Sequence, residues 1–218
     1  MFMKIGVVTA TRAEYGLLKP LIKKIDEDPE TELNLIVTGT HLMEEFGNTI
    51  KYIEEDGIPI IKKIYVQICT DSSISISQTM GRYFMAFSGV FEKLHLDFLI
   101  VLGDRYELIP ICYCATNAKI PIAHISGGEV TEGAIDDAVR HCVTKLSYLH
   151  FPACETYRRR IIQLGESPER VFNVGDPGVE NVKTMKMISE IALRKKLSLD
   201  LKQPYFSVVF HPVTLDDV

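Results

Sequence analysis

The sequence predicts an α/β fold, a doubly wound parallel sheet of the Rossmann-like type, from three observations. Short apolar runs typical of buried strands alternate with amphipathic helical stretches at least six times. No internal repeat or low-complexity linker interrupts this alternation. Two of the runs end directly in charged or glycine residues, at Gly103-Asp104-Arg105 and at Gly127-Gly128-Glu129. Such a sheet binds ligands in the crevice beyond the carboxyl ends of its strands, so these two loops mark the expected site.

The first part of the chain supplies three of the predicted strands. Residues 4–9 are a short, apolar, β-rich run that predicts a buried strand, and residues 10–16 follow as a loop. Residues 17–28 place leucines and isoleucines on one helical stripe, with Pro20 in the first turns, where proline is tolerated. The other predicted elements are a strand at 33–37, a helix at about 42–56 that stops at Gly57, and a strand at 60–68.

The second part of the chain continues the alternation. The helix predicted at residues 134–149 has the clearest amphipathic pattern. Its inward face is predicted to hold Ile135, Ala138, Val139, Cys142, Val143 and Leu146, and its opposite face Asp137, Arg140, His141 and Thr144. The other predicted elements are a serine-rich loop at 70–77, a long helix at 77–96, a strand at 98–102, a helix, a strand at 120–125, a short strand at 150–152, a helix at 156–165, a strand at 171–174, a loop at 175–178 and helical pieces to about residue 199.

The predicted domain boundary lies at residues 200–204. Residues 205–210 then begin an apolar strand that turns polar at His211. A strand followed by nothing is an unusual end for a domain, so we expect it to open a second one. The predicted organisation is a Rossmann-like domain at residues 1–203 and the first strand of a further domain at 204–218.

The composition disfavours several classes of partner. The 218 residues carry a net charge of −5 without a block of like charge, and nucleic-acid binding needs a basic face. No apolar run approaches the roughly 18 residues of a membrane span. The five cysteines have neither disulfide-framework nor zinc spacing, and the first strand begins too early to leave room for a signal peptide. We therefore expect a cytoplasmic protein with reduced cysteines and no metal, membrane or nucleic-acid partner.

Acidic side chains follow two neighbouring predicted strands. An aspartate at Asp104 can act as a base or hold a sugar hydroxyl, and Arg105 beside it can pair with a phosphate. The alternative is a helix cap by Asp104 and an exposed Arg105. Glu129 follows the next strand, and Asp136 begins a helix, where the helix dipole alone favours an acid. Because these positions share one crevice, Asp104, Glu129 and Asp136 are predicted as catalytic carboxylates that divide acid and base roles.

Glycine and basic residues near the same strand ends are candidates for substrate binding. Gly127 and Gly128 let the backbone approach a ligand, or form a plain turn. Arg12 follows the first strand, but its loop is neither the G-x-G-x-x-G fingerprint nor a P-loop, so a nicotinamide enzyme is disfavoured. Among the histidines, His211 ends an apolar strand and is the best functional candidate, His41 and His141 have a structural alternative, and His95 and His150, without polar company, are interpreted as structural.

Eight motifs occur in order: TRAEYG, VTGTH, LGDRYE, HISGGE, IDDAVRHCVTKLSYLH, RRIIQLGE, NVGDPGVEN and VVFHPVT. Together they resemble the hydrolysing UDP-N-acetylglucosamine 2-epimerases of sialic acid synthesis and their relatives for legionaminic acid, over the whole chain. The resemblance implies two Rossmann-like domains of the glycosyltransferase B architecture with the active site between them. This chain would be the N-terminal domain and the first strand of the second. We also expect a homo-oligomer, a dimer or tetramer, at full length.

The resemblance implies that UDP-N-acetylglucosamine and water give N-acetylmannosamine and UDP, without a metal or redox cofactor. A carboxylate base removes the proton on sugar carbon two, UDP leaves carbon one, and water then adds to the resulting 2-acetamidoglucal. Asp104 and Asp136 fall on family catalytic carboxylates, and His211 falls on a histidine that contacts the nucleotide-sugar phosphates. Loss of a diphosphate calls for cations, and Arg12, Arg105 and His211 suit that task.

One position departs from the family pattern. Many members read H-I-E-G-G-E with a catalytic first glutamate, where this chain has Ser126, so Glu129 is expected to take over or the acid and base roles are arranged differently. UDP-diacetylbacillosamine remains an alternative substrate. A glycosyltransferase of the same architecture and a non-catalytic nucleotide-sugar binding module remain alternative functions. The 218-residue chain by itself is predicted to be inactive, because most uridine contacts in this architecture come from the second domain.

Overall fold

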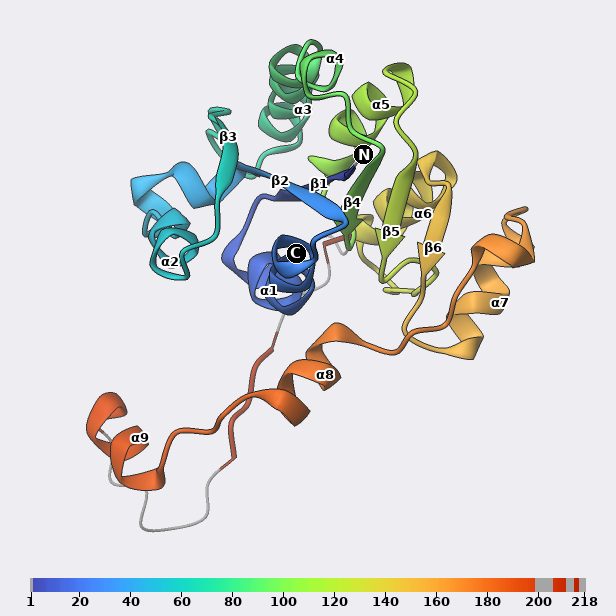
Figure 1. Ribbon diagram of the computed structural model, residues 1–218. Coiled ribbons are helices and arrows are strands. Elements are labelled where there is room, and N and C mark those ends of the chain that lie inside the picture. Colours follow the sequence, from blue (N-terminus) through green and yellow to red (C-terminus); the bar gives the residue numbers. More distant parts are fainter. Residues whose placement is uncertain (1, 199–205, 211–213, 216–218) are drawn as a thin grey trace.

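The sheet confirms the predicted fold class. The computed structural model describes residues 2–198, 206–210 and 214–215. Six parallel strands lie in the order β3-β2-β1-β4-β5-β6 (Figure 1). The strand order reverses at β1, so the carboxyl ends of β1 and β4 flank the point where doubly wound sheets bind ligands. The strands are β1 (Met3–Thr9), β2 (Thr31–Thr38), β3 (Ile60–Ile64), β4 (Phe98–Leu102), β5 (Ile122–Ile125) and β6 (Leu149–Phe151).

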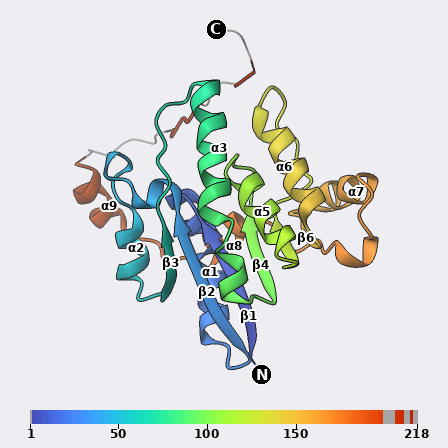
Figure 2. The ribbon, with the colours of Figure 1, turned by 90° about the horizontal axis from the view of Figure 1, so that it is seen from above.

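Helices cover both faces of the sheet, and each face has its own apolar core (Figures 1 and 2). One face is covered by α1 (Arg12–Glu27) and α2 (Ile50–Glu55), and α8 (Pro177–Thr184) packs against α1. The other face is covered by α3 (Ser73–Phe87), α4 (Phe91–Leu94), α5 (Leu108–Asn117) and α6 (Ile135–Leu146). The last helices are α7 (Glu155–Gln163) and α9 (Glu190–Leu197). Across the described ranges, no helix has the length and apolar character needed to cross a membrane.

Helix α1 begins five residues earlier than predicted, which puts Pro20 in its interior. The helix starts at Arg12 because Thr11 caps it, accepting a hydrogen bond from the Glu14 N–H at 3.4 Å. A proline has no N–H, so the Gly16 carbonyl one turn earlier loses its helical donor. The Asn181 side chain from α8 supplies the missing donor at 2.8 Å. The proline is therefore accommodated by a contact between α1 and α8.

Other predicted elements are shorter than expected, and left-handed backbone explains one of these differences. The helix predicted at 42–56 consists of two 3-10 turns, Gly39–Leu42 and Glu44–Phe46, followed by α2, and the break falls at Gly47 and Asn48, which both have positive φ. The strand predicted at 60–68 ends at Ile64. The helix predicted at 77–96 divides into α3 and α4, and α3 begins inside the predicted loop. The strand predicted at 171–174 is a single bridge between His150 and Val171.

The inward face of helix α6 agrees with the prediction only in part: Val139 and Val143 are buried as predicted, and Leu146 packs against the core. Arg140 and Thr144, assigned to the outer face, are buried, whereas Ile135 and Cys142, assigned to the core, are exposed. Ala138 is also exposed. The reason is that α6 packs beside the ends of β4 and β5, where polar groups offer partners for a guanidinium and a hydroxyl. The hydrophobic pattern alone does not report those partners.

The segment after residue 205 shows no strand where the structure describes it. Residues 206–210 are exposed and irregular, and Tyr205 lies outside the described residues. The division into a domain at 1–203 and a strand at 204–218 stays a prediction. The described residues Thr214 and Leu215 contact the main body: the Ile135 N–H donates to Thr214 Oγ1 at 3.0 Å, and the Leu215 N–H donates to the Gly133 carbonyl at 2.9 Å.

Candidate functional site

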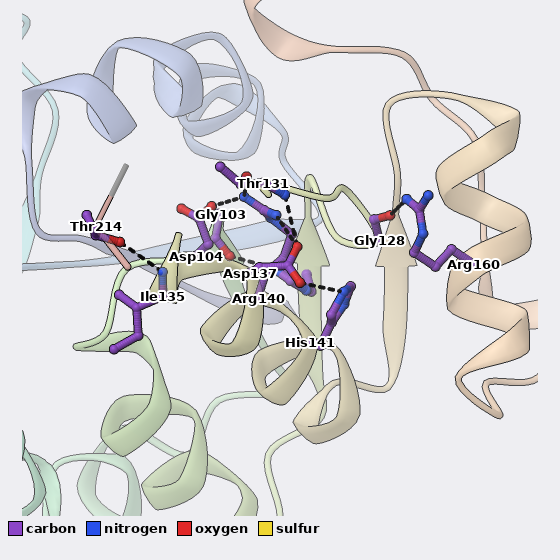
Figure 3. A network of polar contacts seen from close by, with 11 residues as sticks. Gly103, Asp104, Gly128, Thr131, Ile135, Asp137, Arg140, His141, Arg160 and Thr214 are labelled. Carbon is purple, nitrogen blue, oxygen red and sulfur yellow. Dashed lines mark hydrogen bonds and ion pairs between the residues drawn. The ribbon is translucent and has the colours of Figure 1, made fainter. Parts of the chain in front are cut away.

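The polar groups gather where β4 and β5 end and α6 begins. The side chains of Asp104, Thr131 and Asp137 point toward Arg140, whose guanidinium lies at the centre of the group (Figure 3). Asp104 comes from the loop after β4, Thr131 from the loop after β5, and Asp137 and Arg140 from the first two turns of α6. Parallel strands place their carboxyl ends at one edge of the sheet, which explains why loops distant in sequence meet here.

Arg140 organises the site through contacts with three residues. Its Nη2 forms an ion pair with Asp104 Oδ2 and donates to Thr131 Oγ1 at 3.0 Å, and its Nη1 lies 3.6 Å from Asp137 Oδ1. Its side chain is only 5% exposed, and that of Asp104 is 28% exposed. A buried guanidinium must be paired to offset its lost hydration, so Arg140 holds Asp104 in one orientation while leaving that carboxylate accessible.

Glu129 lies in the same electrostatic environment as Asp104. Burial of the half-buried side chain raises its pKa, and the negative charges of Asp176 and Asp104 add to the rise, whereas Arg140 opposes it. A carboxyl group that keeps its proton more readily than usual suits proton transfer near neutral pH. The charge of Asp104 thus acts on Glu129, while the predicted catalytic roles of the two carboxyl groups stay predictions.

Asp137 makes contacts in the site that the sequence did not predict, whereas the catalytic role of Asp136 stays a prediction. Asp137, predicted only as an outer-face residue, accepts a hydrogen bond from the Thr131 N–H at 2.9 Å and lies 3.6 Å from His141 Nε2. Asp136, predicted as catalytic, makes no hydrogen bond or ion pair within the described part of the chain. It is partly exposed in the first turn of α6, so its carboxylate is free to meet a ligand.

Arg105 lies apart from the Arg140 group. Its Nε lies 2.5 Å from Glu107 Oε1 and 3.7 Å from Glu14 Oε1, and both glutamates are buried. The two carboxylates hold the guanidinium against the turn after β1 and the turn after β4, and Glu14 Oε2 also accepts from the Ala10 N–H at 2.8 Å. Burial, and then the charge of Glu107, raises the pKa of Glu14 to about 7. This arrangement uses Arg105 to join two loops.

His41 and Arg12 lie near the carboxyl ends of β1 and β2. His41 is fully buried between the hydroxyls of Thr9, 3.0 Å from Nε2, and Thr49, 2.8 Å from Nδ1. Burial lowers the pKa of His41 to about 4, so it is neutral at pH 7. Arg12 is the first residue of α1, and its guanidinium lies 5.2 Å from the centre of the Tyr52 ring. The structure thus brings neither residue to Arg140.

Gly127 and Gly128 have packing reasons to lack side chains. A Cβ at Gly127 would lie 2.9 Å from His124 Nδ1, and one at Gly128, where φ is +79°, would lie 2.5 Å from the Tyr157 carbonyl oxygen. Arg160 of α7 donates to the Gly128 carbonyl (Figure 3). These contacts anchor the loop after β5 to α6 and α7. His211, the remaining predicted residue, lies outside the described residues.

Sequence reasoning missed several residues of this region. His150, predicted to have no polar company, is buried with its Nε2 3.2 Å from Glu166 Oε2, and His95 takes positive φ at the end of α4. Arg140 was placed on the wrong face, although its spacing of three from Asp137 on a helix was a usable signal. The sequence gives no signal for Glu14, Glu107, His124 and Asp176 as site residues, because their relation to the site depends on contacts between distant loops.

An apolar cavity of about 330 Å³ lies on the opposite face of the sheet from α6. Residues of α1, of β4 and β5 and of the start of α8 line it, including Leu21, Ile100 and Pro177. Asp176 and Glu180 add charge at its boundary. With few polar groups, this cavity does not share the chemistry of the Arg140 group.

Comparison with known proteins gives consistent matches. The family model described as UDP-N-acetylglucosamine 2-epimerase matches residues 23–218. The GDP/UDP-N,N'-diacetylbacillosamine 2-epimerase (hydrolyzing) of Campylobacter jejuni is 42% identical over 98% of this chain and 55% of its own length. Polysialic acid biosynthesis protein P7 of Escherichia coli is 42% identical over 97% of this chain and 54% of its own length. The chain thus spans about half the length of these curated relatives.

Solved structures support the fold. The Methanocaldococcus jannaschii UDP-GlcNAc 2-epimerase, crystallised in complex with UDP-GlcNAc and UDP, superimposes with a TM-score of 0.74 over 91% of this chain and 54% of that chain. Its sequence identity is 20%. At this identity the likeness establishes a shared fold, and the chemistry has to be argued from the residues described above.

Proposed function

Because the chain belongs to the UDP-N-acetylglucosamine 2-epimerase family, we propose that the full-length protein containing it is a hydrolysing 2-epimerase of a UDP-linked amino sugar. The observation that carries the proposal is the Arg140 group: one accessible carboxylate held by a buried guanidinium, beside a second carboxyl group with a raised pKa. Removing a proton from a sugar carbon and later returning one needs such a pair. The proposed activity is that of the whole protein, and this chain is proposed to form one side of its active site.

The proposed substrate is UDP-N-acetylglucosamine, which gives N-acetylmannosamine and UDP in sialic-acid-type sugar synthesis. UDP-diacetylbacillosamine is the second candidate, because a relative at 42% identity is described as a hydrolysing epimerase of GDP/UDP-N,N'-diacetylbacillosamine. The equally similar polysialic acid biosynthesis protein favours the first candidate. Both substrates present the same reacting atoms to the Arg140 group, so one mechanism serves both.

The proposed reaction has two steps. In the first, a carboxylate takes the proton from carbon two, the C1–O bond to UDP breaks, and a C1–C2 double bond forms. In the second, the hydroxyl of a water adds to carbon one and a proton is delivered to the opposite face of carbon two. The sugar is released with carbon two inverted. The net change consumes one water and needs no oxidant or reductant.

The proposed roles follow the environments of the side chains. Glu129, whose pKa is raised by burial, carries the proton exchanged at carbon two, and Asp104 and Asp136 complete the acid and base set. Arg12 at the N-terminus of α1, where helix N–H groups are unpaired, and His211 are proposed to stabilise the leaving diphosphate. Arg105 contributes indirectly by joining the β1 and β4 loops, because two buried carboxylates already pair with it.

The test is a reaction in deuterated water with the full-length protein and each UDP sugar separately. We expect free UDP and a free 2-epimerised sugar that carries deuterium at carbon two, without any acceptor. Asp104→Asn should abolish turnover, whereas Glu54→Gln, an exposed acid paired with Lys63 far from the site, should not. If neither sugar yields UDP, or if product forms only with an acceptor as in a glycosyltransferase, the proposal is wrong.

A further inference from the structure

His124 lies behind the site and was not among its predicted residues. It belongs to β5 and is completely buried. Its Nε2 lies 2.8 Å from the Gly103 carbonyl oxygen at the end of β4, and its Nδ1 lies 3.2 Å from Thr144 Oγ1 on α6. One imidazole thus joins three elements that together build the site. Its cross-strand neighbour His150, also fully buried, bonds instead to Glu166.

The partners determine the tautomer of His124. A carbonyl oxygen can only accept, so Nε2 must carry the hydrogen and donate it to Gly103. Nδ1 is then unprotonated and accepts from the Thr144 hydroxyl. Burial lowers the pKa of His124 to about 4, and the neighbouring His150, Arg140 and His141 also disfavour its protonation. The ring therefore stays neutral at pH 7 with both nitrogens satisfied.

The contacts of His124 connect the two residues of the Asp104–Arg140 ion pair from behind. Gly103 precedes Asp104, and Thr144 lies one helical turn after Arg140. Asp104 and Arg140 form an ion pair, and the Asp104 side chain is 28% exposed. The backbone of Asp104 and the helix that carries Arg140 are thus both held by the same imidazole. A shift of the His124 imidazole would therefore change the distance between the Asp104 carboxylate and the Arg140 guanidinium.

Gly127 provides the space that this bridge needs. A Cβ there would lie 2.9 Å from His124 Nδ1 and 3.1 Å from Thr144 Oγ1. Both distances fall inside ordinary van der Waals contact with groups that are themselves fixed by hydrogen bonds. The glycine after Ser126 is therefore required by the bridge, independently of any ligand.

From this geometry we propose that His124 is a positioning residue, which sets the Asp104 carboxylate against Arg140 through the Gly103 carbonyl and Thr144. The proposal rests on the proposed function and adds a residue to it. His124 touches neither the substrate nor the reacting atoms. Its contribution is to hold a reacting group, and misplacement of such a group by about 1 Å can cost roughly 100-fold in rate.

Two conservative variants of the full-length protein test the bridge. In His124→Gln the side-chain amide reaches the place of Nε2 and can still donate to Gly103, whereas the shorter amide of His124→Asn cannot. With the UDP sugar that the wild type turns over, we expect kcat of His124→Asn to fall about 100-fold with KM changed less than about 3-fold, and kcat of His124→Gln to fall less than about 10-fold. A merely structural histidine predicts equal losses that follow the folded fraction measured by thermal melting.

A threonine pair supplies the matched control. Thr144→Val removes the donor to Nδ1 and should lower kcat by about 10-fold, the order expected for one lost hydrogen bond. Thr79→Val removes a buried hydroxyl that has no partner among the residues described, and should leave kcat unchanged. Equal effects of the two changes would contradict the proposal.

Imidazole ¹⁵N spectra of the full-length protein give a readout that does not depend on activity. The wild type should show a signal for a neutral ring protonated at Nε2 that disappears in His124→Gln. A ring protonated at Nδ1, or wild-type kcat in folded His124→Asn, overturns the proposal. If the wild type releases no UDP from either sugar, the proposed function fails instead, and the spectra alone decide whether the bridge exists.

Discussion

At the scale of single residues, the site depends on which cation each carboxylate meets. Two arginines lie near Asp104, Arg105 in the sequence and Arg140 in space, and only Arg140 pairs with it. Arg105, its neighbour in sequence, turns away to the buried pair Glu14 and Glu107. Arg140, 36 residues along the chain, forms the ion pair with Asp104. The arginine adjacent in sequence therefore joins loops, and the distant one orients the candidate catalytic group.

The first prediction concerns the Asp104–Arg140 pair. Arg140→Met leaves Asp104 and Asp137 without their buried cation and should destabilise the protein by about 2 kcal/mol or more. In combination with Asp104→Asn the loss should be smaller than the sum, with a coupling of about 1–3 kcal/mol. Thermal melting of the single and double variants measures this cycle. Arg159→Met, at an exposed arginine, is the control, and strict additivity at the Asp104 pair would contradict the prediction.

The second prediction concerns pH and Glu14. Its pKa in the folded protein is raised from 4.5 to about 7, chiefly by burial, so the folded state holds a proton that the unfolded state has lost. The contribution of this proton to stability is fully present below pH 4.5 and is lost as the pH rises toward and through 7. Glu14→Gln stays neutral, and should be more stable than wild type above pH 7 by about 1–3 kcal/mol.

Melting temperatures of the two proteins between pH 4.5 and 8 check the Glu14 prediction. The difference in stability should be small at the acid end and should grow with pH, because only the wild-type side chain ionises in that window. Glu30→Gln, at an exposed glutamate, should show no such growth. Parallel curves for wild type and Glu14→Gln would show that the buried carboxyl is already ionised at low pH.

At the scale of elements, helix α1 shows how one local defect is corrected by another element. Pro20 leaves the Gly16 carbonyl without its helical donor, and Asn181 of α8 replaces that donor. Because this bond crosses from α1 to α8, it also fixes the position of the loop before α8, which carries Asp176. Asp176 in turn contributes to the raised pKa of Glu129. A proline in one helix is thereby connected to the electrostatics of the site.

The third prediction follows from this replacement. Asn181→Ala should destabilise the protein by about 0.5–1.5 kcal/mol, the net value of one hydrogen bond. Pro20→Ala restores an N–H to the helix, so Asn181→Ala in that background should cost less. Thermal melting of the four proteins measures both costs, with Asn173→Ala at an exposed asparagine as the control. An equal cost in both backgrounds would show that Asn181 acts by other contacts.

At the scale of the whole molecule, we propose that the chain forms one side of a site that a second domain completes. The candidate carboxylates occupy one edge of the sheet, and the predicted phosphate ligand His211 comes after the domain boundary predicted at residues 200–204. The described residues Thr214 and Leu215 return to the loop that contains Gly133 and to the first residue of α6. The chain spans about half the length of its curated relatives. A substrate held between the two predicted domains would need contacts from both.

The fourth prediction concerns that incompleteness. The isolated 218-residue chain should release no UDP from either UDP sugar under conditions in which the full-length protein does, because most uridine contacts are expected from the second domain. Its folding should first be verified by circular dichroism, so that loss of structure is distinguished from loss of contacts. Turnover by the folded fragment would show that this chain carries the whole site.

Much of the fold was predictable because the signals are local. Alternating apolar runs and amphipathic stretches predicted a parallel sheet and the edge that carries the loops of Asp104 and Glu129, since every parallel strand brings its carboxyl end to the same edge. Two of the errors in element length came from left-handed backbone at Gly47 and Asn48 and from the early cap at Thr11, which hydrophobic periodicity does not report.

The sequence by itself thus determined the order of the elements and the edge of the sheet at which acidic residues collect. Only the tertiary structure decided that α6 buries Arg140 and Thr144 and that Arg105 joins the loops after β1 and β4. It also decided that His124 connects the ends of β4 and β5 to α6 by hydrogen bonds. The physical reason is that a buried polar side chain takes the orientation in which its hydrogen bonds are satisfied, and its partners here come from segments distant in sequence.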